Sequence, residues 1–103
     1  MAALEEFVSV IRETETVRSF LQGLEGESVK LLGAICREYE ATDKAVPDHH
    51  LYLTGYSSEM ILRALVSAEV VIKEPGDRLS LHGYRPTEAG LKHYRAMLDE
   101  KAI

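Results

Sequence analysis

The sequence predicts a mostly helical single domain with one small β-hairpin in its C-terminal half. Three observations predict it: apolar residues recur at helical spacing in several segments, a β-branched run follows at 70–72, and a Pro-Gly turn with an alternating segment comes next. With 103 residues, 46% of them hydrophobic, the chain can bury one core without disulfides or metals. It shows no internal repeat or linker, so we expect residues 1–103 to form one domain.

The first predicted helix covers residues 2–22, and its apolar residues form a stripe along one side. Helix propensity alone would leave this segment marginal in water, so the stripe needs a partner surface. That surface is either the rest of the domain or a second copy of the chain, in which case residues 1–24 are a dimerisation element. For a homodimer, the predicted interface consists of Leu4, Phe7, Val10, Val17, Leu21 and Leu98.

The central part of the chain predicts two further helices and a short one between them. The second helix runs from Glu27 to Tyr39, and residues 41–47 favour a turn. Pro47-Asp48 suits the start of a short helix that reaches residue 54. After a tight turn at Gly55-Tyr56, Ser57 or Ser58 is expected to cap a third helix over Glu59–Glu69.

The hairpin is predicted from the change of period after the third helix. The run Val70–Ile72 prefers an extended chain, and Glu74–Asp77 forms a turn in which Gly76 accepts a positive φ. Residues then alternate up to Tyr84, with Leu79 and Leu81 on one face and polar side chains on the other, which indicates a half-buried hairpin.

A closing helix is predicted from Glu88 to about Lys101, capped by Thr87. It is expected to bury Leu91, Tyr94 and Leu98.

Helix, short helix, turn, helix, two-stranded wing and helix is the order of a winged helix-turn-helix. The segment Leu53–Leu98 resembles the DNA-binding part of MarR-like and PadR-like transcriptional regulators, whose closing helix opens with Tyr-x-Pro/Leu-Thr-Glu-x-Gly. Here that opening is Tyr84-Arg85-Pro86-Thr87-Glu88-Ala89-Gly90. The resemblance implies a winged-helix core with its C-terminal helix over 27–101. The chain has Ala68-Glu69 where the family usually has a glycine before the first wing strand.

Charge is distributed unevenly along the chain, whose formal net charge is −5. Excess acid lies before residue 57, whereas 78–95 holds four basic residues and one acid. The resemblance implies DNA readout by helix 57–69 and backbone contact by wing 70–85, with cytoplasmic transcription regulation as the function. The implied DNA-binding residues are Ser57, Ser58, Glu59, Met60, Arg63, Lys73, Arg78, His82 and Arg85.

A different function stays open, in which the same domain is a protein–protein interaction module without DNA binding. It is suggested by the acidic first half and by the mostly apolar third helix, whose Leu62 or Val66 would then remain exposed. Likewise, the basic residues of the wing also fit a solvated edge strand that charge protects from aggregation.

The remaining residue types indicate no cofactor and no catalysis. Cys36 is the one cysteine and is interpreted as a core residue, and no Cys/His spacing fits zinc. The histidines at 49, 50, 82 and 93 are interpreted as surface residues, the alternative being a metal or pH sensor. Phosphate-binding loops, nucleophile elbows and metalloprotease motifs are absent from the sequence, so we expect no enzyme. An acidic start and no long apolar run predict a cytoplasmic protein without membrane contact.

Overall fold

The computed structural model describes residues 2–12, 24–51, 56–76 and 78–101. These residues form four α-helices, one short 3-10 helix and three strands. In chain order the elements are α1 (Ala2–Arg12), α3 (Leu24–Thr42), β1 (Val46–Pro47), η1 (Asp48–Leu51), α4 (Tyr56–Ser67), β2 (Val71–Pro75), β3 (His82–Pro86) and α5 (Glu88–Asp99). The prediction of a mostly helical fold with a small antiparallel hairpin is confirmed.

The three strands make one antiparallel sheet in the order β1-β3-β2. Strand β2 pairs with β3 as a hairpin, in which Lys73 lies opposite Tyr84. Strand β1 was not predicted, because its two residues follow a turn and include a proline. Val46 nevertheless pairs with Tyr84 and is fully buried, so tertiary packing holds this short edge strand in place.

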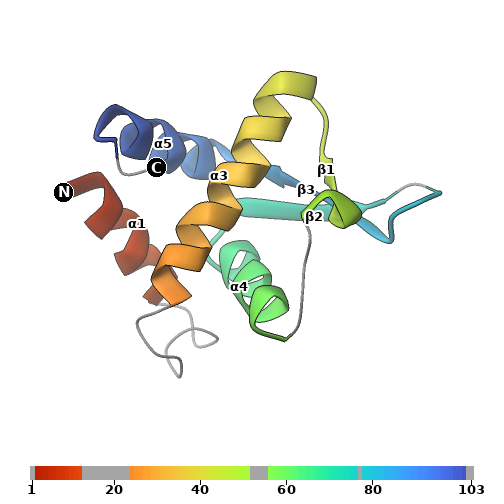
Figure 1. The fold of residues 1–103 in the computed structure, drawn as a ribbon, viewed down its shortest axis with the longest axis horizontal. Coiled ribbons are helices and arrows are strands. Elements are labelled where there is room, and N and C mark those ends of the chain that lie inside the picture. The colour runs from red at the N-terminus through yellow and green to blue at the C-terminus, as the bar shows by residue number, and fades with distance from the viewer. Residues whose placement is uncertain (1, 13–23, 52–55, 77, 102–103) are drawn as a thin grey trace.

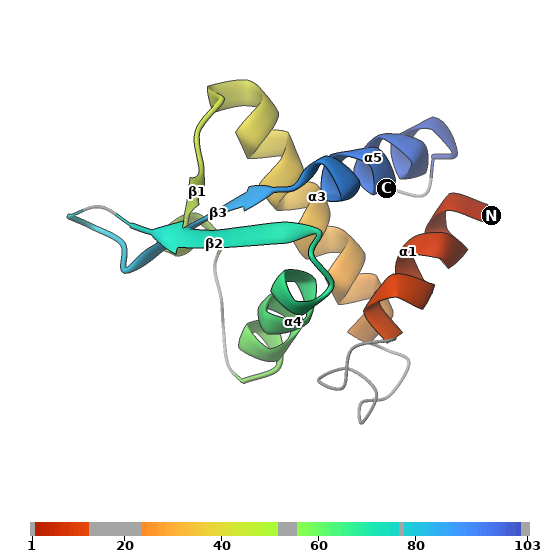
Figure 2. The same ribbon diagram turned by 180° about the vertical axis from the view of Figure 1, so that it is seen from behind.

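Helix α3 crosses the middle of the molecule and contacts α4, α5 and the sheet (Figure 1). Helices α1 and α5 lie together at one end, and the hairpin projects from the other end, as both views show (Figures 1 and 2). Helix α4 lies below the sheet in Figure 1. Among the residues described, no helix combines the length and the apolar character that a bilayer crossing needs.

The core is continuous from α1 through α3 to the sheet, and it includes Cys36 as predicted. Burial raises the pKa of the Cys36 thiol to about 12, and the Glu40 carboxylate acts in the same direction. That thiol therefore stays protonated. The largest fully buried apolar side chains are Phe7, Ile11, Leu32, Ile35, Leu65, Met97, Val46, Val70 and Val71.

The junction between α4 and β2 meets the start of α5. Glu69 ends α4 with a φ of 62°, in the left-handed region, and the Val70 N–H donates to the Leu65 carbonyl at 3.2 Å. Thr87 donates its hydroxyl to the Glu69 carbonyl at 2.7 Å and its N–H to the Val70 carbonyl at 3.0 Å. The same hydroxyl accepts the Gly90 N–H at 3.0 Å, so the predicted cap is confirmed.

Several predicted bounds were wrong by one turn or less. Helix α4 begins at Tyr56, so Ser57 and Ser58 lie inside its first turn and do not precede it. Helix α3 extends the predicted second helix at both ends. In α5, Tyr94 is buried as predicted, but Met97 takes the core position and Leu98 is 42% exposed. The predicted first helix is described up to Arg12, and Val17 and Leu21 lie outside the described residues.

The predicted orientation of the hairpin was wrong. Leu79 and Leu81, expected on the apolar face, are 81% and 83% exposed, whereas Ser80 and Tyr84 are each only 6% exposed. Tyr84 reaches the core from β3, and its register opposite Lys73 fixes which face of the strand turns inward. Gly76 does not adopt a positive φ either. A side chain there would collide with the backbone carbonyl of Ser80, and glycine permits the close approach.

Candidate nucleic-acid interface

A groove of about 760 Å³ separates α4 from the hairpin, and η1 closes one side of it. Helix α4 contributes the largest share of the lining. The end of the hairpin loop, at Leu81, and one face of the sheet contribute the rest. The lining residues are Asp48, His49, Glu59, Leu62, Arg63, Val66, Ser67, Lys73, Leu81, His82 and Tyr84.

Charges of both signs line this groove. Arg63 from α4 and Lys73 from β2 are exposed, and neither forms an ion pair or hydrogen bond with another described residue. Glu59 lies one turn before Arg63, but the two side chains make no ion pair. The spacing of four residues would allow a Glu59–Arg63 ion pair that competes with DNA for the guanidinium, but that pair does not form. Arg63 and Lys73 remain available for an anionic partner.

The acidic residues of the groove act on its aromatic floor. Burial raises the pKa of the Tyr84 hydroxyl, and the carboxylates of Asp48 and Glu59 raise it further. The hydroxyl is therefore neutral at physiological pH. The Asp48 carboxylate also accepts the His82 N–H at 3.2 Å, which connects η1 to the first residue of β3.

Four of the nine predicted DNA-binding residues line the groove, namely Glu59, Arg63, Lys73 and His82. Ser58 and Met60 are half-buried on α4, and Ser57 belongs to its first turn. Arg78 is exposed on the loop between the strands and has no ion pair or hydrogen bond to any other described residue.

Arg85 lies elsewhere. Its neighbour Tyr84 faces the groove, so Arg85 points to the opposite face of the sheet, where its Nε donates to the Glu74 carboxylate at 3.0 Å. This ion pair sets Arg85 apart from the other basic residues of the hairpin.

The positive balance of residues 78–95 does not form one surface. Arg95 binds the Glu40 carboxylate on α3 at 3.0 Å, and Lys92 lies on the far side of α5 beside α1. Arg78 is the one basic residue of this segment that lies on the hairpin loop. The number of basic residues in segment 78–95 therefore overstates how many of them lie near α4. Arg63, which is outside this segment, is an additional basic residue on α4.

Comparison with protein-family models, curated proteins and solved structures found no match to this chain. The groove and the elements around it are therefore the basis on which a function is proposed.

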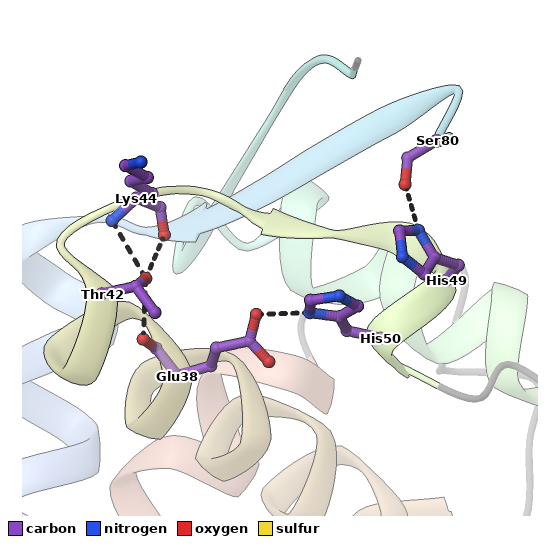
Figure 3. A network of polar contacts seen from close by, with 6 residues as sticks. All are labelled: Glu38, Thr42, Lys44, His49, His50 and Ser80. Atoms are coloured by element: carbon purple, nitrogen blue, oxygen red, sulfur yellow. Dashed lines mark hydrogen bonds and ion pairs between the residues drawn. The ribbon is translucent and has the colours of Figure 1, made fainter. Parts of the chain in front are cut away.

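The two histidines of the 3-10 helix point in different directions, and only His49 contacts the hairpin loop. Figure 3 shows the His49 ring in hydrogen-bond contact with the Ser80 hydroxyl and the His50 ring facing Glu38 on α3. The His50–Glu38 contact is 2.6 Å between Nδ1 and the carboxylate. These contacts connect α3, η1 and the hairpin loop, and they fix the rim of the groove.

The histidines are not gathered in one place. His82 lies on β3, while His93 lies on α5 with its ring 5.8 Å from the Phe7 ring. Burial lowers the pKa of His93, Glu6 opposes this shift and Lys92 adds to it. Within the described part of the chain, no group of three His, Cys, Asp or Glu side chains is arranged to hold a metal ion.

Sequence reasoning missed Asp48, Tyr84 and Leu81 as groove residues. Pro47-Asp48 predicted the start of a short helix, but nothing in the sequence showed that the Asp48 side chain lines the groove. The alternating pattern placed His82 and Tyr84 on one face correctly but did not show that this face turns inward. Leu81 could not be recognised as a groove residue, because a leucine in an alternating segment is expected to be buried in the core.

The predicted dimer residues divide between the core and the surface. Phe7 is fully buried in its own chain, where α1 packs on α5. Leu4 and Val10 are half-buried, and Val10 lines a second groove, of about 670 Å³, between α1 and α5. Leu98 is exposed at the end of α5.

Proposed function

We propose that this protein is a winged helix-turn-helix transcriptional regulator that binds duplex DNA through α4 and the β2–β3 hairpin. Helix α4 enters the major groove, and the hairpin lies against the adjacent backbone. The observation that carries this proposal is the single groove face on which α4 and the hairpin together present the unpaired cations Arg63 and Lys73.

The order of the elements supports this function. A helix, a short strand, a short helix, α4, a hairpin and a closing helix follow one another, and β1 pairs with β3 as a third strand. The Thr87–Gly90 opening of α5 has a physical role in this arrangement, since its cap binds the backbone that ends α4. A fold by itself does not fix function, so the proposal of DNA binding is supported mainly by the cations on the groove face.

Arg63 is the residue of α4 best suited to read a base. Its guanidinium can donate two hydrogen bonds to the O6 and N7 atoms of guanine, and Glu59 can accept from the amino group of cytosine. Lys73 and Arg78 supply contacts to phosphate from the hairpin. Arg85 is left out of the contact surface, because it faces away and is paired with Glu74.

A titration of fluorescent mixed-sequence duplex at low salt tests this function. We expect micromolar or tighter binding by the wild type. The variant Arg63→Ala, Lys73→Ala, Arg78→Ala should bind about tenfold or more weakly, because a protein with fewer cations on this face releases fewer counterions from the DNA. The matched control is Arg37→Ala, Arg85→Ala, Arg95→Ala, which removes the same charge from other surfaces. Equal losses in both triple variants would reduce binding to a net-charge effect and contradict the assigned face.

Removing a groove carboxylate should act in the opposite direction. Glu59 is exposed beside Arg63, so its charge opposes phosphate on the same face. Glu59→Gln should therefore bind mixed-sequence DNA several-fold more tightly, whereas Glu88→Gln on α5 should leave the affinity unchanged. A gain of affinity is an informative result, because a damaged fold does not produce one.

A protein–protein interaction module is the second candidate function. The carboxylates of Asp48 and Glu59 in the groove and the net charge of −5 favour it. Leu62 is buried and does not support it, while Val66 is half-buried in the groove. If the duplex titration shows no binding at micromolar protein and low salt, this second function replaces the first.

We further propose that the regulator acts as a homodimer through α1 and α5, so that two copies match a two-fold DNA site. Leu4, Val10 and Leu98 keep apolar surface at this end of the molecule, whereas Phe7 belongs to the core and is left out. Sedimentation equilibrium should give a dimer that Leu98→Glu weakens. A monomer at all concentrations would contradict the dimer and leave the groove unaffected.

A further inference from the structure

The loop between β2 and β3 exposes the two largest apolar side chains on the hairpin. Leu79 and Leu81 are 81% and 83% exposed, while Ser80 between them is buried. Leaving a leucine side chain in water forgoes the free energy that its burial would gain, so this orientation costs stability in the free protein. The two leucines together offer apolar surface to a partner.

The leucines are held in position before any partner binds. The Gly76 N–H donates to the Leu81 carbonyl at 3.1 Å across the loop, and the His82 N–H donates to the Asp48 carboxylate. The Ser80 hydroxyl contacts His49, as Figure 3 shows. A loop fixed by contacts on both sides loses little conformational entropy on binding, which favours insertion into a defined site.

Charge and position identify the partner. Leu81 lines the same groove as Arg63 and Lys73, so the end of the loop and the face of α4 that carries Arg63 belong to one side of the molecule. Arg78, next to Leu79, is exposed and is not paired with any described residue. Apolar side chains flanked by unpaired cations fit a polyanion whose interior is apolar, namely the stacked bases of duplex DNA.

Two leucines are also too small a surface for a stable protein contact. A specific protein interface buries about 800 Å² on each partner, far more than two side chains expose. An intercalating wedge needs only one or two apolar side chains.

We propose that Leu79 and Leu81 form an apolar wedge that enters the minor groove beside the site of α4, partly unstacks one base step and bends the duplex. The wedge rests on the DNA-binding function proposed above. It gives the protein a preference for easily unstacked pyrimidine–purine steps at a position where no side chain reads a base edge.

A duplex carrying 2-aminopurine at a central TA step, with dyes on its two ends, tests the wedge. On saturation with the wild type, 2-aminopurine fluorescence should rise several-fold and the end-to-end distance should shorten. The variant Leu79→Ser, Leu81→Ser should still bind, within about tenfold of the wild-type affinity, because the phosphate contacts remain. It should leave both signals at the values of free DNA. The matched variant Leu79→Met, Leu81→Met keeps apolar side chains and should restore both signals.

The outcomes separate the wedge from the function on which it rests. If the wild type saturates the duplex without changing either signal, or if the serine variant changes both as the wild type does, the wedge is wrong and DNA binding stands. If the wild type does not bind the duplex at all, both are wrong. In that case, self-association that the serine variant abolishes would assign the leucines to a second copy of this chain.

Discussion

The two ends of β3 are built in opposite ways. At its C-terminal end, Thr87 donates two hydrogen bonds to the backbone carbonyls of Glu69 and Val70 and accepts the Gly90 N–H, and Gly90 approaches the Val70 carbonyl closely. At its N-terminal end, the loop residues Gly76, Ser80 and Leu81 are also held by hydrogen bonds, yet Leu79 and Leu81 are exposed to solvent. The first end stabilises the fold, and the second is the surface that we propose for contact with DNA. A strand of five residues thus joins a structural junction to an exposed loop.

The largest effect is expected at the closed end, from Gly90→Ala. A β-carbon at position 90 would collide with the Val70 carbonyl, which is backbone and cannot move aside. The free energy of unfolding should fall by about 3 kcal/mol in urea titrations. Gly26→Ala on α3 is the matched control, because outside its chain neighbours and its own helix backbone no described residue has an atom within 4 Å of the added carbon, and it should be neutral or slightly stabilising. Equal effects at both positions would refute the close approach.

The same junction offers a stabilising change at Glu69. Its left-handed φ of 62° strains any residue with a β-carbon, and glycine removes that strain. Glu69→Gly should raise the free energy of unfolding by about 0.5–1 kcal/mol, while Glu69→Ala keeps the strain and should not. Thermal melts of the three proteins measure this. A glycine variant less stable than the alanine variant would contradict the assigned backbone.

At the open end, Ser80→Ala should lower the free energy of unfolding by about 1 kcal/mol, since the contact of its buried hydroxyl with His49 is lost. Ser67→Ala, an exposed serine on α4, is the control and should change the melting temperature little. If Ser80→Ala melts like the wild type, η1 does not hold the loop.

The smallest effect on stability is expected from Leu79→Ser, Leu81→Ser. Both side chains are exposed, so the free energy of unfolding should change by less than about 0.5 kcal/mol. Two buried leucines, as the alternation of the sequence predicts, would instead cost about 2–5 kcal/mol each. Chemical unfolding of this double variant therefore decides directly between the two orientations of the hairpin.

These two ends also mark how far the sequence predicts the structure. The Thr87 cap and the start of α5 were predictable, because a cap depends on residues within one turn of each other. The glycine at 90 was recognisable as part of a motif, and the Val70 carbonyl now explains it. Glu69 takes the backbone conformation that usually selects glycine, at the position where the regulators that this segment resembles usually have one, so it carries a cost in strain.

The orientation of the loop and the distribution of charge were not predictable. Alternation fixes which residues share a face, but the inward face is chosen by Tyr84 packing against a core assembled from distant segments. In the same way, Arg85 and Arg95 counted as free cations in the sequence but are paired with Glu74 and Glu40. Arg63, which Glu59 precedes by one helical turn in the sequence, forms no ion pair with it among the described residues.

The salt dependence of DNA affinity tests the assigned binding face most directly. If Lys73 and Arg78 each neutralise a phosphate, a plot of log affinity against log salt should be shallower by about 1.8 in the variant that replaces both with alanine, and unchanged in Arg85→Ala, Arg95→Ala. Parallel lines for the wild type and the first variant would contradict a DNA contact at the face formed by α4 and the hairpin.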